Sequence, residues 1–261
     1  MPLRTVNATR YVLALREGGS LPAIVEADDL GLYVVKFRGA GQGPLALVAE
    51  LVAGEIGRAL GLSVPEIVFI EIDSILGRND PDAEIRHLLK ASVGLNLALD
   101  YLPGSTMFDP AAKDHISPEV ASLGVWFDGF VQNVDRTPRN ANLLCWHREV
   151  RFIDHGAALY FHHNWESMSD KATSPFPQIR EHILLPWVDD VEKASRLAHE
   201  RLTPEVLHDI LALVPDSWLA SEADPLTAGE RRAGYLDFFL RRLASSFIFE
   251  AEVARARELL V

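Results

Sequence analysis

The chain has 261 residues, of which 48% are hydrophobic and 24% charged, enough for one two-lobed domain or two small ones of ordinary globular composition. Its formal net charge of −12 argues against a nucleic-acid-binding surface, because phosphate contacts need clustered cations. No apolar run approaches the roughly 20 residues of a membrane span, the first 19 residues lack a secretory signal, and the single cysteine, Cys145, suits a reducing compartment. We therefore expect a cytoplasmic protein with no membrane span and no nucleic-acid partner.

The start of the chain predicts a β-hairpin. Residues 11–16 and 21–27 are interpreted as its strands, with a turn at Gly18, Gly19 and Ser20. A glycine turn lets backbone N–H groups approach phosphates closely, although this one lacks the full G-x-G-x-x-G spacing. We therefore predict that Gly18, Gly19 and Ser20 bind nucleotide phosphates.

Lys36 lies in an apolar segment, LYVVKF at residues 32–37, that predicts a strand. Lysine is rare in this chain, with five lysines among 25 basic residues, and a lysine within a strand is seldom buried unless it is paired. A glycine-rich connection and a predicted helix over residues 45–60 follow, with apolar residues at helical spacing. Glu50 and Glu55 both lie on this helix, five positions apart, so they point in different directions and only one can face Lys36.

Further elements are predicted downstream. Residues 66–72 alternate as a strand with one buried face, and residues 79–87 indicate a helix capped near Asp80, with Pro81 in its first turn. Helices are also expected over residues 178–185, from residue 204 onward and, as one helix or a pair, over residues 231–260. A solvated face is expected for four arginines of the last segment: Arg231, Arg232, Arg241 and Arg242.

The stretch from residue 126 to residue 160 contains the residues that predict catalysis. An apolar-periodic helix leads into the polar loop NVDRTPRNAN at residues 133–142, and two short strands then end in Asp154, followed by His155 and Gly156. The hairpin is expected to place Asn140 and Asp154 side by side. One carboxylate, an amide five residues later and a second carboxylate suit phosphoryl transfer, in which one carboxylate deprotonates a hydroxyl and the other two groups hold Mg²⁺.

These motifs resemble the catalytic and metal loops of the protein-kinase-like fold. Asp135 to Asn140 matches H-R-D-x-x-x-x-N, and the I-D-H-G ending at Gly156 matches D-F-G. The sequence pattern N-x-D-R-x-x-x-N followed by I-D-H-G is also similar to that of phosphatidylinositol-type kinases, but it most resembles the HipA-like kinase family. The resemblance to that family extends from about residue 11 to residue 182. Departures are Thr137, where the family commonly has histidine, and a length that leaves no room for the extra N-terminal subdomain of toxin-type members.

The resemblance implies an α+β, two-lobed fold, with an antiparallel-sheet N-lobe over residues 1–99 and a mainly helical C-lobe over residues 100–261. It implies ATP and Mg²⁺ as cofactors and the following roles. Lys36 matches the V-A-I-K lysine that grips the phosphates, and Glu50, before L-V-A-G-E-I-G, matches its partner, with Glu55 the alternative. Asp135 would be the catalytic base, Asn140 and Asp154 the metal ligands with Asn142 competing, and the adenine hinge would be Asp100, Tyr101 and Leu102.

The function expected from these residues is transfer of the ATP γ-phosphate to a hydroxyl acceptor, most simply a serine or threonine of a protein. Two alternatives remain open at this point: a nucleotide-binding pseudokinase scaffold, and a kinase of a small-molecule or lipid hydroxyl. Arg136, directly after Asp135, either binds the transferred phosphoryl group or anchors the loop.

Overall fold

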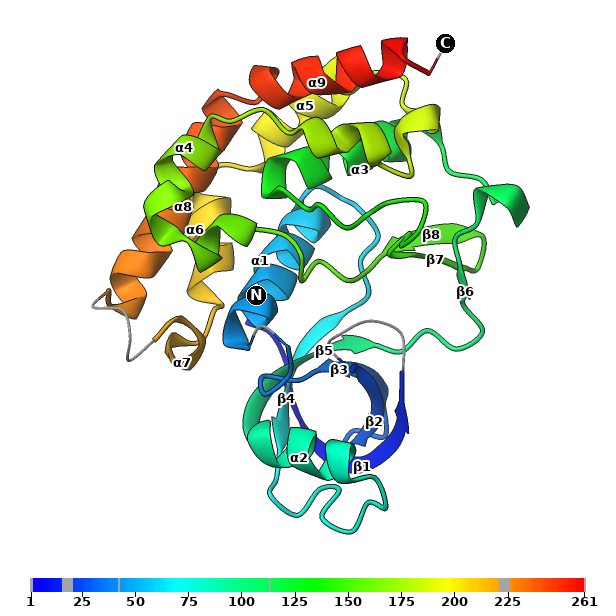
Figure 1. Ribbon diagram of the computed structural model, residues 1–261, viewed down its shortest axis with the longest axis vertical. Coiled ribbons are helices and arrows are strands. Elements are labelled where there is room, and N and C mark those ends of the chain that lie inside the picture. The colour runs from blue at the N-terminus through cyan, green and yellow to red at the C-terminus, as the bar shows by residue number, and fades with distance from the viewer. Residues whose placement is uncertain (1, 16–20, 42, 113, 221–225, 261) are drawn as a thin grey trace.

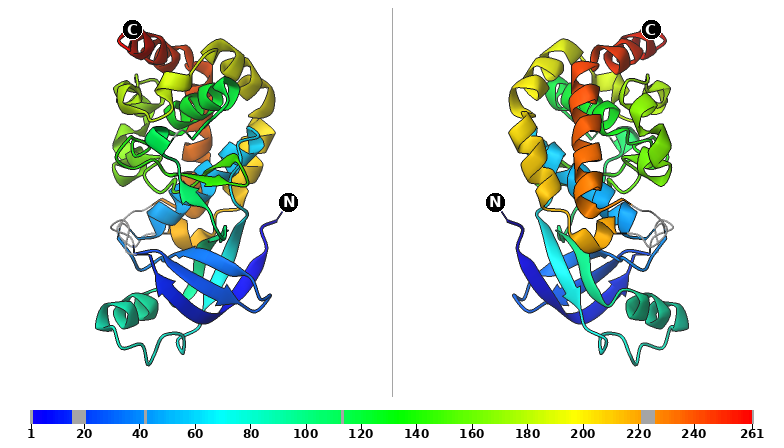
Figure 2. Two further views of the ribbon diagram at one scale, coloured as in Figure 1. Left: turned by 90° about the vertical axis from the view of Figure 1, so that its right-hand side faces the viewer. Right: turned by 90° about the vertical axis from the view of Figure 1, so that its left-hand side faces the viewer.

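The computed structural model describes residues 2–15, 21–41, 43–112, 114–220 and 226–260. The N-terminal part is a closed five-stranded barrel in the order β1-β2-β3-β5-β4, and it lies at one end of the molecule (Figures 1 and 2). The barrel strands are β1 (Thr5–Ala14), β2 (Ala23–Ala27), β3 (Leu32–Lys36), β4 (Ile67–Ile72) and β5 (Gly94–Asp100).

The barrel corrects the expectation of an antiparallel sheet, because β1 and β4 pair in parallel. β1 begins at Thr5, earlier than predicted, and its first residues pair with β4 through Thr5 and Phe69, while its later residues pair with β2. The pairing of β1 with β2 contains two register shifts. Irregularities of this kind bend a strand and increase its twist, which is what closing a sheet requires.

The rest of the chain is mainly helical. The helices are α1 (Pro44–Ala59), α2 (Ala83–Ala91), α3 (Pro118–Val131), α4 (Met168–Ala172), α5 (Val191–Arg201), α6 (Pro204–Ala212), α7 (Asp216–Leu219), α8 (Ala228–Ala244) and α9 (Phe247–Glu258). A small antiparallel sheet is formed by β6 (Thr106–Met107), β7 (Leu143–Trp146) and β8 (Glu149–Phe152). No helix in the described part of the chain is both long and apolar enough to cross a bilayer.

Helix α1 leaves the barrel and packs among the C-terminal helices, as Figure 1 shows. Its side chains belong to one large apolar cluster with α3, α6, α7, α8 and α9, whereas a second cluster fills the barrel interior. Leu47, Leu51 and Ile56 are almost completely buried, and so are most of the residues between them. A helix that is apolar all round is a buried helix, so α1 is held on several sides.

Three local predictions change, and one that was left open is decided. The cap of α2 is Asp82, which accepts a hydrogen bond from the Glu84 N–H, because Asp80 instead accepts one from the Asp82 N–H. Residues 178–185 contain no α-helix but lie in and around two short 3₁₀ turns, Pro177–Glu181 and Leu185–Trp187, each opened by a proline. The last helical segment is a pair, α8 and α9, and α8 begins at a capping box of Thr227 and Glu230.

The third correction concerns the arginines of α8, since Arg231 and Arg242 are buried rather than solvated. Arg242 donates hydrogen bonds to the carbonyls of Gly129, at 2.7 Å, and Ser174, and its guanidinium stacks over Phe249 at 4.6 Å. Burial lowers the pKa of Arg242 to about 10, so the side chain stays charged at neutral pH. It ties the segment after α4 to the end of α3.

Candidate active site

Three stretches converge on the Lys36 ammonium. Nζ lies 2.6 Å from Asp154 Oδ1 and 3.8 Å from Glu50 Oε2, so strand β3, helix α1 and the segment after β8 meet there. The Lys36 side chain is only 12% exposed, which its two carboxylate partners make tolerable. Burial lowers the pKa of Lys36, but Glu50 and Asp154 outweigh that effect and leave it raised above its ordinary value.

Glu50 is the helix acid that faces this junction. It is 1% exposed, and its Oε2 accepts a hydrogen bond of 2.8 Å from the His155 N–H. Burial raises the pKa of Glu50, but the Lys36 ammonium and the contacts with His155 bring it down to about 2. Glu55 lies elsewhere, beside Arg58 at 3.4 Å, and burial raises its pKa. The five-residue spacing therefore separates the two acids as helix geometry requires.

The predicted catalytic loop, residues 133–142, is folded around Asp135. The Asn140 amide donates to Asp135 Oδ2 at 2.7 Å, and the Asn142 amide lies 3.4 Å from the same oxygen and 3.4 Å from the Asp154 carbonyl. Asn142 and Asp154 both have positive φ, at 47° and 53°. Asn142, rather than Asn140, thus makes the contact with Asp154 at the end of the β7–β8 hairpin, where the Ile153 N–H donates to the Asn142 carbonyl at 3.1 Å.

A buried cluster of charged and polar side chains holds this loop in place. Asp128 of α3 pairs with Arg136 at 2.6 Å and with His182 at 2.7 Å, and its other oxygen accepts from the Asn133 amide at 3.0 Å. His182 Nδ1 accepts a hydrogen bond from the Leu184 N–H, so the ring proton sits on Nε2 and points at Asp128.

Arg136 is an anchor in this structure. It is 1% exposed, it donates to the carbonyls of Asn142 and Ile153, and its guanidinium lies 5.0 Å from the Phe152 ring centre. One guanidinium therefore joins the catalytic loop to the segment between β8 and Asp154. Neither Asp128 nor His182 was singled out from the sequence. The available signal was an acid inside an otherwise apolar helix, WFDGF at residues 126–130.

Acid titration should report these buried carboxylates. The pKa of Asp128 is held at about 2, because Arg136 and His182 outweigh the raising effect of burial, and Glu50 is held at about 2 as described above. Groups with depressed pKa stabilise the fold above their ordinary pKa and lose that contribution as the pH falls through the folded value. The melting temperature should therefore hold above about pH 5 and fall steeply between pH 4.5 and 2, the ordinary and folded values for Glu50.

This expectation is checked by circular dichroism melts at a series of pH values and fixed ionic strength. Glu50→Gln should flatten the profile in that window, since its side chain no longer takes up a proton. An unchanged slope in the variant would contradict the role given to the Glu50 carboxylate.

The predicted hinge continues β5 towards the small sheet. The Tyr101 N–H donates to the Leu32 carbonyl at 2.9 Å, and Leu102 is buried. Among the described residues, none accepts a hydrogen bond from the Leu102 N–H. Burial raises the pKa of Asp100. The other predicted nucleotide contacts, Gly18, Gly19 and Ser20, lie outside the described residues.

The donor set around Asp154 fits a magnesium ion. The described residues hold no cluster of three or more histidines, cysteines and acids that could bind a metal by themselves. A Mg²⁺ ion needs fewer protein ligands than that, because it binds one or two protein carboxylates and completes its coordination shell with phosphates and water. The Asp154 side chain is 42% exposed, and the Asn140 NH₂ group is turned towards Asp135, which leaves the amide oxygen for a cation.

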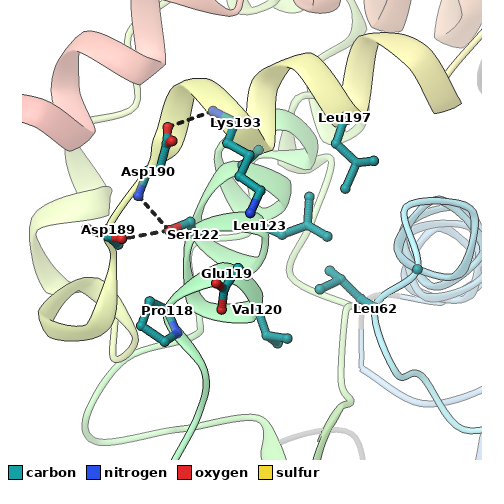
Figure 3. Close-up of a pocket in the computed structure, with 12 residues that line it drawn as sticks. Leu62, Pro118, Glu119, Val120, Ser122, Leu123, Asp189, Asp190, Lys193 and Leu197 are labelled. Carbon is teal, nitrogen blue, oxygen red and sulfur yellow. Dashed lines mark hydrogen bonds between the residues drawn. The ribbon is translucent and has the colours of Figure 1, made fainter.

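Two further features, a buried histidine and a cavity, lie outside this site. His162 is buried against Tyr235, with Nδ1 3.0 Å from the hydroxyl, and burial lowers its pKa to about 3, so it is neutral. A cavity of about 190 Å³ lies between the starts of α3 and α5 and the turn after α1 (Figure 3). It contains none of the residues above and is smaller than the roughly 300–1,000 Å³ of typical small-molecule sites.

The barrel, the lysine–glutamate–aspartate junction and the adjoining Asp135 loop define a kinase. Residues 10–249 match the family model described as HipA-like kinase, which is most of the chain, and the protein belongs to that family. The comparison with curated proteins found no match.

Two solved kinases are similar in structure. The crystal structure of the Helicobacter pylori proinflammatory kinase CtkA aligns over 100% of both chains with a TM-score of 0.58 and 15% identity, which shows a shared fold. The golgi casein kinase aligns over 98% of this chain and 74% of its own, with a TM-score of 0.45 and 10% identity. Membership of the HipA-like kinase family makes the enzyme a phosphotransferase, and the likeness to CtkA shows that it has an α+β kinase fold.

Proposed function

We propose that this kinase transfers the γ-phosphate of ATP to the hydroxyl of a serine or threonine in a protein. The observation that carries the proposal is the position of the Lys36 ammonium, which lies 2.6 Å from Asp154 Oδ1 and 3.8 Å from Glu50 Oε2. In this proposal residues 1–99 and 100–261 are the two lobes, and the nucleotide lies between them.

The adenine would lie against the hinge at Asp100, Tyr101 and Leu102. The Leu102 N–H supports this placement, since no described residue occupies it. The α- and β-phosphates would bind the Lys36 ammonium, whose position is fixed by the buried Glu50 carboxylate. Gly18, Gly19 and Ser20 are proposed to cover the phosphates with their backbone N–H groups.

Asn140 and Asp154 would hold Mg²⁺ through oxygen atoms, with Asn142 positioning the Asp154 backbone. The ion would supply positive charge that offsets the charge developing on the transferred phosphoryl group. In the present arrangement Lys36 is bonded to Asp154 Oδ1, so a phosphate arriving at Lys36 would replace a carboxylate oxygen and free it for the cation.

Asp135 is proposed as the catalytic base. The acceptor hydroxyl oxygen forms a bond to the γ-phosphorus, the bond from that phosphorus to the β–γ bridging oxygen breaks, and ADP leaves. The hydroxyl proton passes to the Asp135 carboxylate. The hydrogen bond from Asn140 fixes the orientation of that carboxylate, and Arg136 fixes the loop beneath it.

Nucleotide binding provides the test. Mg-ATP at about 100 times its Kd should add roughly 2.7 kcal/mol to the stability of the folded protein. At about 2–4 °C per kcal/mol, this corresponds to a rise in melting temperature of roughly 5–11 °C. Asp154→Ala should lose most of the magnesium-dependent part of that rise.

The matched control is Asp209→Ala, which removes an exposed carboxylate on α6 and should respond to Mg-ATP as the wild type does. Both variants should melt near the wild-type temperature without nucleotide. If no nucleoside triphosphate gives the wild type a magnesium-dependent shift, the proposed nucleotide site is wrong.

A further inference from the structure

The catalytic loop presents an arginine at the tip of a fixed turn. The Thr137 N–H donates to the Asn140 carbonyl at 3.0 Å, and the Asn140 N–H donates to the Thr137 carbonyl at 3.0 Å. These reciprocal bonds leave Pro138 and Arg139 as the two central residues of the turn, and the proline ring fixes its own φ. The backbone of Arg139 is therefore held in a defined place relative to Asn140.

Arg139 differs from the other cations of the site in having no partner among the described residues. Lys36 is engaged by two carboxylates, and Arg136 is buried against Asp128. The Arg139 side chain is exposed, and within the described ranges no residue forms an ion pair or hydrogen bond with it. Acids outnumber basic residues in this chain by 37 to 25, yet none of the described acids forms an ion pair with Arg139.

Its position puts this charge beside the path of the acceptor. Consecutive Cα atoms are about 3.8 Å apart, and the side chain of the next residue, Asn140, contacts Asp135 at 2.7 Å. A hydroxyl that gives its proton to Asp135 must approach this carboxylate from solvent, and the exposed Arg139 directly precedes the asparagine that holds this carboxylate. A guanidinium binds a carboxylate or phosphate through two parallel hydrogen bonds, which lysine cannot reproduce.

We propose that Arg139 selects the acceptor, and that this kinase prefers a serine or threonine flanked by carboxylate side chains. This inference rests on the proposed function, because it gives a substrate class to the same site. The sequence left open that Arg136 binds the transferred phosphoryl group, but its guanidinium is enclosed by the protein. Of the two arginines in this loop, Arg139 is the one that is exposed to an external anion. The anion it binds belongs to the acceptor and not to the nucleotide, whose phosphates are assigned to Lys36.

The test uses three serine peptides of equal length, whose residues around the serine are acidic, neutral or basic. Transfer of labelled phosphate from ATP is measured for the wild type, for Arg139→Glu and for Arg148→Glu. Arg148 is the matched control, because it is also an exposed arginine without a partner among the described residues, but it lies at the opposite end of the β7–β8 hairpin from Asn142.

The wild type should show a kcat/KM about tenfold higher for the acidic than for the basic peptide, or about 1.4 kcal/mol. Arg139→Glu should reverse the order, Arg148→Glu should keep it, and KM for ATP should stay the same in all three proteins. The preference should weaken as salt is raised, because the contact is exposed.

Three results would overturn the proposal. The first is the same peptide order in the wild type and in Arg139→Glu. The second is an increase in KM for ATP in Arg139→Glu that is equal with every peptide, which would assign the arginine to the nucleotide. The third is no labelling of any peptide by a wild type that binds and hydrolyses Mg-ATP. Failure of the proposed function itself looks different, since Mg-ATP would then neither bind nor be consumed.

Discussion

Asp135→Asn is expected to reduce phosphate transfer by about 10²–10⁴-fold, the usual contribution of a positioned general base. Asparagine keeps the size of the side chain and can still hydrogen-bond with Asn140, which contacts Asp135 at 2.7 Å. It cannot accept the proton of the acceptor hydroxyl. The effect should therefore appear in kcat, while the affinity for Mg-ATP stays near that of the wild type.

The measurement pairs a transfer assay with the Mg-ATP melting shift on the same preparations. A normal shift together with lost transfer would separate catalysis from binding. Asp209→Asn serves as a comparison, because it makes the same change at an exposed carboxylate of α6. Equal labelling by the wild type and Asp135→Asn would mean that Asp135 does not carry the chemistry, and a lost shift would mean that the substitution disturbs the nucleotide site.

Asp128→Asn should give the largest loss of stability. The change leaves the Arg136 guanidinium buried without its counter-charge, since both side chains of this pair are fully enclosed. Breaking a buried ion pair in this way costs about 3–5 kcal/mol. At about 2–4 °C per kcal/mol, the melting temperature should fall by roughly 6–20 °C.

Thermal melts followed by circular dichroism at pH 7 measure this loss, with Asp209→Asn as the control. The Asp209 side chain is 85% exposed and its contact with His208 is long, so its replacement should change the melting temperature by little. A fall for Asp128→Asn no larger than for this control would show that the Asp128 cluster does not stabilise the loop.

The sequence allowed the site to be outlined because its key residues lie in short local patterns. Asp135 and Asn140 share one loop, and Asp154 ends the following hairpin, so their nearness depends on a few intervening residues. The choice between Glu50 and Glu55 needed the structure, since either acid lies on α1 and only packing decides which face of the helix is turned to Lys36.

Contacts between distant segments were not predictable in the same way. Barrel closure depends on pairing Thr5 with Phe69 in parallel, which no local alternation indicates. Arg242 was expected in solvent because its residue type usually lies there, but its hydrogen-bond acceptor is the carbonyl of Gly129, 113 positions earlier in the chain. The role of Asp128 was not predicted, because its partners, Arg136 and His182, lie on other segments.

The burial of α1 has a consequence for how this kinase can be regulated. Many kinases are switched off when the helix that carries the lysine's glutamate partner moves outward. Here such a movement would expose Leu47, Leu51 and Ile56, which are now almost completely buried. Exposing each of these side chains would cost about 1.5–3 kcal/mol. The helix that carries Glu50 is thus locked in its inward position by the main core, and control of this enzyme has to act on access to the site instead of on its assembly.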